Sequence, residues 1–448
     1  MSDKHVLPEL HSLRAIQEST VHRFADFSVH PIHTHLLVAI LEDHTDDRPS
    51  AVHNEICMIN TLTQELRSFV SGADFYSSPR FSPDGARIAW KQWFHPDMPW
   101  EGAEIYVADI QVENDTFIPK NTVHIAGERG TISVSYPLWV SNDALIFTND
   151  ESGYQNPWIF APGPLAKAVP IFNVAIAEDF GGPAWTLGGS PFAPLDSSGK
   201  RMLFVSTRDG RSALYLADLE SRTLPLEIEC PYAVMQNVRQ VPAGNAEVVF
   251  IGCKVDESQT LVHCTLQPVQ STKPKYKTLK STSSTISAAA SFPLEIVSIP
   301  QPITLEVTSG EPLHVVFYPP NNPEYAGTNL PGELPPCVLN VHGGPTWMTG
   351  QGLDWEKTFY TSRGWAWYVV RLNPLQLNLS FLTQVRCELW WLVGLRTPIH
   401  VSRQASRSGL TPALILAPVS VLQENGVSWT SKIAFVQHAS FPVHLTTL

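Results

Sequence analysis

The four residues His342, Gly343, Gly344 and Pro345 follow the apolar run 337–341 and have the composition of a reactive loop. Glycines placed directly after a buried strand let backbone N–H groups approach an oxygen that becomes negatively charged, because no Cβ keeps the two apart. Acyl transfer needs such donors in its transition state. The sequence therefore predicts that Gly343 and Gly344 shape an oxyanion-binding loop.

An acyl-transfer enzyme with this loop also needs a serine in a Gly-x-Ser-x-Gly turn further along the chain, followed by an acid and then a histidine. No such turn occurs after Pro345. Ser428 lacks the second glycine of the turn, and Ser190 precedes a proline that would distort it. His438 and His444 remain, but a histidine without its serine and acid is not a triad. We therefore expect no catalytic nucleophile in this chain.

The loop would be held by a strand, a helix and a second strand. The run 337–341 is continuously apolar, as expected for a parallel strand that is buried on both faces. Residues 354–363 have helical spacing, with Trp355 and Phe359 four apart and a glycine as the stop signal. A further apolar run covers 365–372. This order predicts a βαβ unit of an α/β sheet.

The first three hundred residues repeat one pattern, in which an apolar run, a polar turn and a second apolar run follow one another. The central apolar positions of five copies lie 48, 58, 57 and 46 residues apart, at Ile40, Ile88, Ile146, Leu203 and Val249. A period of about fifty residues with short strands is typical of β-propeller blades. A β-sandwich would not repeat this pattern five times. We predict seven blades, five of them visible and two in the weakly patterned flanks.

The chain divides into three parts on this basis. Residues 1–295 are the predicted propeller, in which 267–295 is a polar connection or a degraded last blade. Residues 296–373 begin an incomplete α/β-hydrolase domain with a hairpin. Residues 374–448 form an aberrant or divergent tail that has only two acidic residues against five basic ones. A frameshift, a retained intron and true divergence all remain open as origins of this tail.

Composition limits which binding partners and which cellular compartment we expect for this protein. The net charge is −12, from 42 acidic and 30 basic residues, which argues against a nucleic acid or an anionic membrane as partner. The six cysteines form no Cys-x-x-Cys pair, and we expect free thiols. We find no secretory signal, no apolar run long enough to cross a membrane, no metal-ligand cluster and no phosphate-binding loop. These features predict a cytoplasmic protein without a cofactor.

The propeller, the hairpin, the segment from Val341 through Pro345, the aromatic helix and the following strand together resemble the prolyl oligopeptidase family of serine peptidases. The likeness covers about residues 20–373 and is nearest to the acylaminoacyl-peptidase and dipeptidyl-peptidase branch. It implies a propeller that caps an α/β-hydrolase domain and admits short peptides, which a Ser-Asp-His triad cleaves near their N-terminus. It also implies that His342 is structural. Glu178 and Asp179 are candidates to contact the substrate amine, with a solvated loop as the alternative.

Two functions follow from this interpretation. The first is the family's hydrolysis of short peptides, which this chain would not complete because its nucleophile segment is missing. The second is a non-catalytic β-propeller interaction module. The sequence does not determine the oligomeric state.

Overall fold

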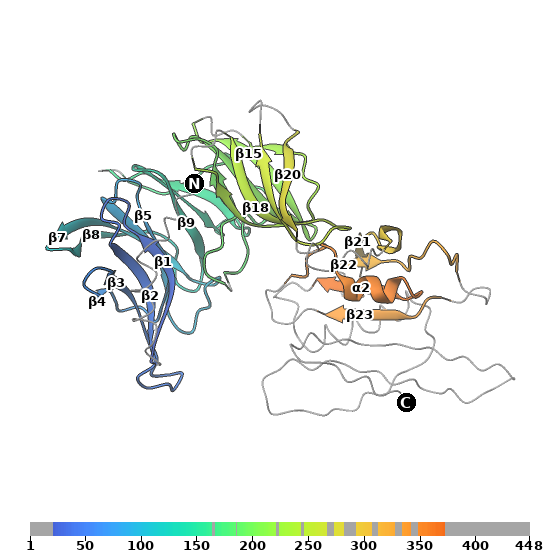
Figure 1. The fold of residues 1–448 in the computed structure, drawn as a ribbon, viewed down its shortest axis with the longest axis horizontal. Helices are drawn as coiled ribbons and strands as arrows, with labels where there is room; N and C mark the ends of the chain where they lie inside the picture. The colour runs from blue at the N-terminus through green and yellow to red at the C-terminus, as the bar shows by residue number, and fades with distance from the viewer. Residues whose placement is uncertain are drawn as a thin grey trace, which may run out of the picture.

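The computed structural model describes residues 21–163, 166–184, 186–220, 224–242, 246–266, 273–281, 293–306, 312–327, 334–341 and 348–371 (Figure 1). The predictions for the loop 342–345 and for the tail 374–448 lie outside these residues. The described part of the chain has no helix with the length and apolar character needed to cross a lipid bilayer.

Five antiparallel sheets of four strands follow one another along the chain, each in sequence order. The first two sheets contain β1 (His22–Val29), β2 (Leu36–Asp43), β3 (His53–Asn60) and β4 (Glu65–Val70), then β5 (Phe75–Phe81), β6 (Arg87–Trp93), β7 (Glu104–Glu113) and β8 (Thr116–Ala126). The third contains β9 (Val134–Ser141), β10 (Ala144–Asn149), β11 (Asn156–Phe160) and β12 (Val169–Pro170). The last two contain β13 (Phe192–Pro194), β14 (Arg201–Arg208), β15 (Arg211–Asp218) and β16 (Leu226–Ile228), then β17 (Val234–Gln240), β18 (Glu247–Cys253), β19 (Thr260–Thr265) and β20 (Lys275–Ser281).

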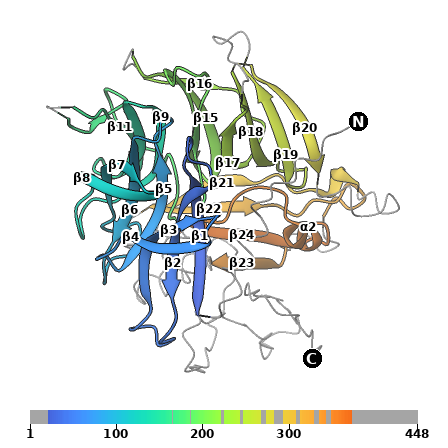
Figure 2. The same cartoon turned by 60° about the vertical axis from the view of Figure 1, so that its left-hand side comes forward.

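These sheets are the blades of a propeller. They fan out around a common centre from β1 to β20 (Figure 2), and the first strands of neighbouring blades contact one another, β1 with β5, β5 with β9 and β13 with β17. The five predicted central positions all lie in the second strand of a blade, so the predicted period is confirmed. The structure describes five blades, and most of the flanks in which two more were predicted lie outside it.

The segment predicted as a polar connection or a degraded last blade has a different role where it is described. Residues Lys275–Ser281 form β20, which pairs with β19 and completes the fifth blade as its outer strand. The burial of β20 is low along most of its length, as expected for a strand at the rim. This exposure explains why its sequence lacks the apolar run by which the inner strands were recognised.

One apolar core lies between each pair of neighbouring blades. Blades one and two share a core around Trp90, and blades two and three share one around Phe147. Phe204 belongs to the core between blades three and four, and Phe250 to the core between blades four and five. A single four-stranded sheet cannot cover its own two faces, so stacking of blades supplies the burial that holds each one.

A sixth, mixed sheet has the strand order β21-β22-β24-β23 and lies beyond the fifth blade at the right of Figure 1. Its strands are β21 (Gln301–Glu306), β22 (Pro312–Tyr318), β23 (Cys337–Val341) and β24 (Ala366–Arg371), with a 3-10 helix η2 (Leu294–Ile296) before them and α2 (Trp355–Thr361) between the last two. β21 and β22 pair antiparallel as the predicted hairpin, whereas β23 and β24 pair parallel. The predicted strand, helix and strand are therefore present.

Residues 348–354 attach this sheet to the propeller. The Leu353 N–H donates to the carbonyl of Lys254 at 2.7 Å, and the Gln351 side chain donates to the carbonyl of Asp209. A Cβ added at Gly352 would lie 2.6 Å from the Cys253 sulfur, so only glycine allows this close approach. The start of α2 is thus fixed to the fourth and fifth blades.

Candidate functional site

The structure describes both sides of the predicted oxyanion loop but not the loop itself. β23 ends at Val341, directly before His342, and pairs parallel with β24 through the partners Val341 and Val370. After the loop, Asp354 caps α2 with its carboxylate, which accepts from the N–H groups of Glu356 at 2.9 Å and Lys357 at 3.3 Å. The roles of His342, Gly343, Gly344 and Pro345 stay predictions.

The two aromatic residues whose spacing indicated the helix do not form its buried side. Trp355 is 40% exposed and Phe359 is 50% exposed. The buried residues of α2 are instead Lys357, Thr358 and Thr361. The period of the sequence therefore predicted the helix correctly, while the face that packs inward is the polar one.

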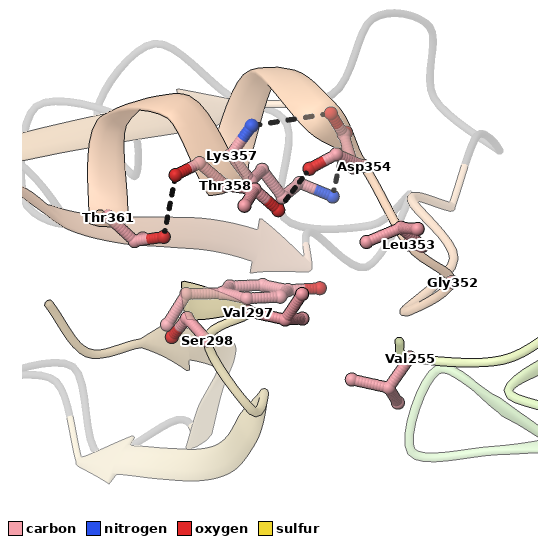
Figure 3. Close-up of a pocket in the computed structure, with 10 residues that line it drawn as sticks. Val255, Val297, Ser298, Gly352, Leu353, Asp354, Lys357, Thr358 and Thr361 are labelled. Carbon is pink, nitrogen blue, oxygen red and sulfur yellow. Dashed lines mark hydrogen bonds and ion pairs between the residues drawn. The ribbon is translucent and has the colours of Figure 1, made fainter. Parts of the chain in front are cut away.

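That polar face borders a small hollow between α2, the residues near η2 and the turn after β18 (Figure 3). Lys357 forms an ion pair with Asp354 at 3.3 Å and lies over the ring of Tyr318, 5.1 Å from its centroid. Burial raises the pKa of Tyr318. The lining residues include no histidine, cysteine or glutamate, and the hydroxyl of Ser298 donates to the carbonyl of Pro319 at 2.6 Å. Its chemistry is that of a packed contact that positions α2.

Glu178, a predicted contact for the substrate amine, is buried and has its carboxylate occupied. It accepts hydrogen bonds from the hydroxyls of Ser206 and Tyr215, the latter at 3.0 Å, and lies 3.3 Å from the guanidinium of Arg208. Burial and the bond to Glu178 raise the pKa of Tyr215, and the bond to Glu227 raises that of Arg208. These contacts anchor the segment between blades three and four to the strands β14 and β15.

Asp179 differs from its neighbour because it is exposed. Its carboxylate accepts the N–H of Gln155 at 3.0 Å, and its carbonyl accepts the N–H of Thr207 at 2.9 Å. Its charge also contributes to a raised pKa at Asp150, for which burial is the largest cause. Glu178 and Asp179 as contacts of a substrate amine stay a prediction.

The side chains that contact Glu178 were not found from the sequence. Ser206, Arg208 and Tyr215 surround Glu178, yet they belong to the apolar strand pattern and gave no separate signal. Ser190, excluded as a nucleophile, donates its hydroxyl to the carbonyl of Phe192 at 2.8 Å. The side chains around Glu178 become recognisable only when the segment that carries it is docked on β14.

No protein-family model matches the sequence, and no curated protein matches it. Solved structures do. A puromycin-hydrolysing peptidase from Mycobacterium tuberculosis is 29% identical, with a TM-score of 0.65. The match covers 78% of this chain and 51% of the peptidase chain. A puromycin hydrolase is 25% identical, with a TM-score of 0.67, and the match covers 79% of this chain and 51% of the hydrolase chain. Prolyl oligopeptidase B from Galerina marginata shares only the fold, since its identity is 8%. Its TM-score is 0.58, and the match covers 78% of this chain and 45% of that protein.

The chain thus spans about half the length of the solved structures that it matches. The matches cover 78% and 79% of this chain. Over this part, the chain resembles the serine peptidases of the prolyl oligopeptidase family.

Proposed function

We propose that this chain is the propeller and the first strands of an α/β-hydrolase domain from a serine-type oligopeptidase or aminopeptidase. The proteins of this family would cleave short peptides near the N-terminus through a Ser-Asp-His triad. The observation that carries the proposal is the 29% identity to a puromycin-hydrolysing peptidase over 78% of the chain. A mutant of the related puromycin hydrolase is known in complex with PGG. Short peptides are therefore the substrate class that we infer.

We infer further that the 448-residue polypeptide does not itself catalyse this reaction. Its sequence contains no Gly-x-Ser-x-Gly turn after Pro345, and without a nucleophile only binding and polarisation remain. The proposed division places the propeller at 1–295 and the start of the peptidase domain at 296–373. The proposed location is the cytoplasm.

A fluorophosphonate probe tests this proposal, because it reacts covalently with an activated serine. The purified chain should remain unlabelled while an active serine peptidase in the same tube is labelled completely. It should also leave puromycin intact over hours. Stoichiometric labelling that one serine-to-alanine substitution removes would show that the chain has its own nucleophile and would contradict the proposed inactivity.

A non-catalytic interaction module is the second candidate. It is favoured by the fifth blade, where Leu261 and Leu279 are 40% and 50% exposed on strands β19 and β20. Exposed apolar side chains can contribute to the binding of a partner. A chain that is unlabelled by the probe but binds another protein through Leu261 would favour this function over a merely inactive peptidase fragment.

A further inference from the structure

Two arginines occupy equivalent positions in the first strands of two blades. Arg80 lies in β5 and Arg239 in β17, and each comes two residues after a non-glycine residue with positive φ, Ser78 at 53° and Asn237 at 55°. The register of each strand shifts at this point, between Ser77 and Arg80 and between Gln236 and Arg239. A β-bulge of this kind changes the direction of the side chain that follows it.

The local contacts of the two arginines are also the same. Arg80 donates one guanidinium N–H to the carbonyl of Pro79 at 2.7 Å, and Arg239 donates to the carbonyl of Val238 at 2.9 Å. In each case the acceptor is the residue directly before the arginine. The two side chains therefore leave equivalent first strands with the same local contact.

Their charges differ in how they are compensated. Arg80 forms an ion pair with Asp26 at 2.7 Å, and the Asp26 carboxylate is only 3% exposed and also accepts the N–H of Ser78. Arg239 donates instead to the neutral carbonyl of Gly188. Within the part of the chain that the structure describes, no carboxylate lies within ion-pair distance of Arg239.

The two guanidinium groups share one electrostatic environment although they come from the second and the fifth blade. Burial lowers the pKa of Arg239, the charge of Arg80 lowers it further, and Asp26 raises it. Two cations thus face one carboxylate, which leaves one positive charge in a chain of net charge −12. Each guanidinium has five N–H donors, so donors remain for a further acceptor.

We propose that Arg80 and Arg239 form a binding site for the carboxylate of a short peptide at the centre of the propeller. The choice of a peptide as ligand rests on the proposed function, whereas the carboxylate follows from the two guanidinium groups. Planar guanidinium groups bind carboxylates through paired N–H donors, which an ammonium or an amide does not reproduce. The carboxylate could be the C-terminus of the peptide or an acidic side chain.

The test is equilibrium binding to the purified full chain by calorimetry at low salt, which requires no hydrolysis. Tri-alanine with a free C-terminus is compared with tri-alanine amide and with Ala-Asp-Ala amide. We expect the free acid to bind at least about tenfold more tightly than tri-alanine amide, as the loss of a charged hydrogen bond implies. Preference for Ala-Asp-Ala amide would assign the site to acidic side chains and still support it. Equal affinity for all three would overturn the proposal.

The decisive variant is Arg239→Gln, because it removes one guanidinium without leaving Asp26 unpaired. We expect a loss of about tenfold or more in affinity for the carboxylate peptide, with partial recovery in Arg239→Lys. Arg67→Gln is the matched control, since Arg67 lies on the outer strand β4 beside Glu65. Circular dichroism establishes that each variant is folded. If Arg239→Gln binds as tightly as Arg67→Gln, the site is not there.

The two proposals can fail separately. If the fluorophosphonate probe leaves the chain unlabelled and the chain does not distinguish acid from amide, only the carboxylate site is lost. If the chain binds the acid through Arg239 and is not labelled, both proposals are supported.

Discussion

The fourth and fifth blades each have four antiparallel strands in sequence order, but they differ in how many of their two faces are packed against other residues. In β14 five consecutive residues, Met202 to Ser206, are buried, so both faces of that strand are packed. In β18 burial alternates, with Val248 and Phe250 buried and Val249 and Ile251 half-buried between them. The buried pair faces the core shared with the fourth blade.

This difference shows that a blade obtains its stability from its neighbours rather than from its own sheet. The pairing of β18 with β19 is as regular as that of β14 with β15, and the pairing of β18 with β17 is interrupted only by the bulge between Gln236 and Arg239. What the fifth blade lacks, among the described residues, is a second blade stacked on its other face. Hydrogen bonds between strands therefore form within each blade, whereas burial depends on the neighbouring blades.

The largest effect should come from a residue at the centre of a shared core. Phe204 is 0% exposed and packs against Phe172, Phe180 and Phe192. Phe204→Ala should lower the free energy of unfolding by about 3–5 kcal/mol, because the cavity cannot be refilled by neighbouring blades. Urea unfolding followed by tryptophan fluorescence measures this loss. A change below about 1 kcal/mol would mean that blades three and four do not depend on their common core.

A matched pair of leucines compares the two blades directly. Leu214 in β15 is 0% exposed, whereas Leu261 in β19 is 40% exposed. Leu214→Ala should cost about 2–5 kcal/mol, while the same change at Leu261 should cost less than about 1 kcal/mol. The same urea experiment gives both values. Equal losses would indicate that the outer face of the fifth blade is covered in solution.

A buried lysine extends the comparison to the second blade through the pH dependence of stability. Burial lowers the pKa of Lys91 from 10.5 to about 7, and its ammonium group donates to Pro99 and Ser135, both at 2.7 Å. Between these two pKa values the unfolded chain binds more protons, so stability should rise with pH from about 7 to 10.5.

The variant Lys91→Met isolates this contribution. Its stability relative to the wild type should be greatest below pH 7, where the folded protein holds the lysine charged, and should decline up to pH 10.5. Thermal unfolding at a series of pH values provides the comparison. A difference between the two proteins that does not vary with pH would show that Lys91 is solvated.

The smallest effect concerns the attachment of α2 beside the fifth blade. Asp354→Ala removes the cap from the first turn, which should cost about 1 kcal/mol and increase hydrogen exchange at Glu356 and Lys357. Amides of β14 should exchange as before. If they also became faster, the fourth blade and the helix would unfold as one unit, and the contrast between the blades would be weaker than the burial suggests.

The sequence allowed the blades to be placed because their second strands combine an apolar run with a preceding polar turn, as at Ile88 and Leu203. It did not allow the bulges to be placed. The residues with positive φ there include Ser78, Tyr136 and Asn237, which are not the glycines by which such positions are usually recognised. Their conformation depends on packing between blades, and this is why the equivalence of two arginines was visible only in three dimensions.

The candidate site was predictable to a similar extent. The strand before the loop follows from its apolar run, and the helix after it follows from the spacing of Trp355 and Phe359. Glu178 was named as a candidate contact for a substrate amine, but its burial was not predicted, because its partners Ser206 and Tyr215 come from a later blade. Contacts between residues far apart in the sequence produce no local periodic pattern from which they could be predicted.

The bonds from Gln351 and Leu353 to the propeller imply an order of assembly. The acceptors of these bonds, Asp209 and Lys254, are synthesised about a hundred residues or more before their donors, so on the ribosome the fourth and fifth blades emerge first. They can serve as a template on which the newly made helix is oriented before its own sheet is complete.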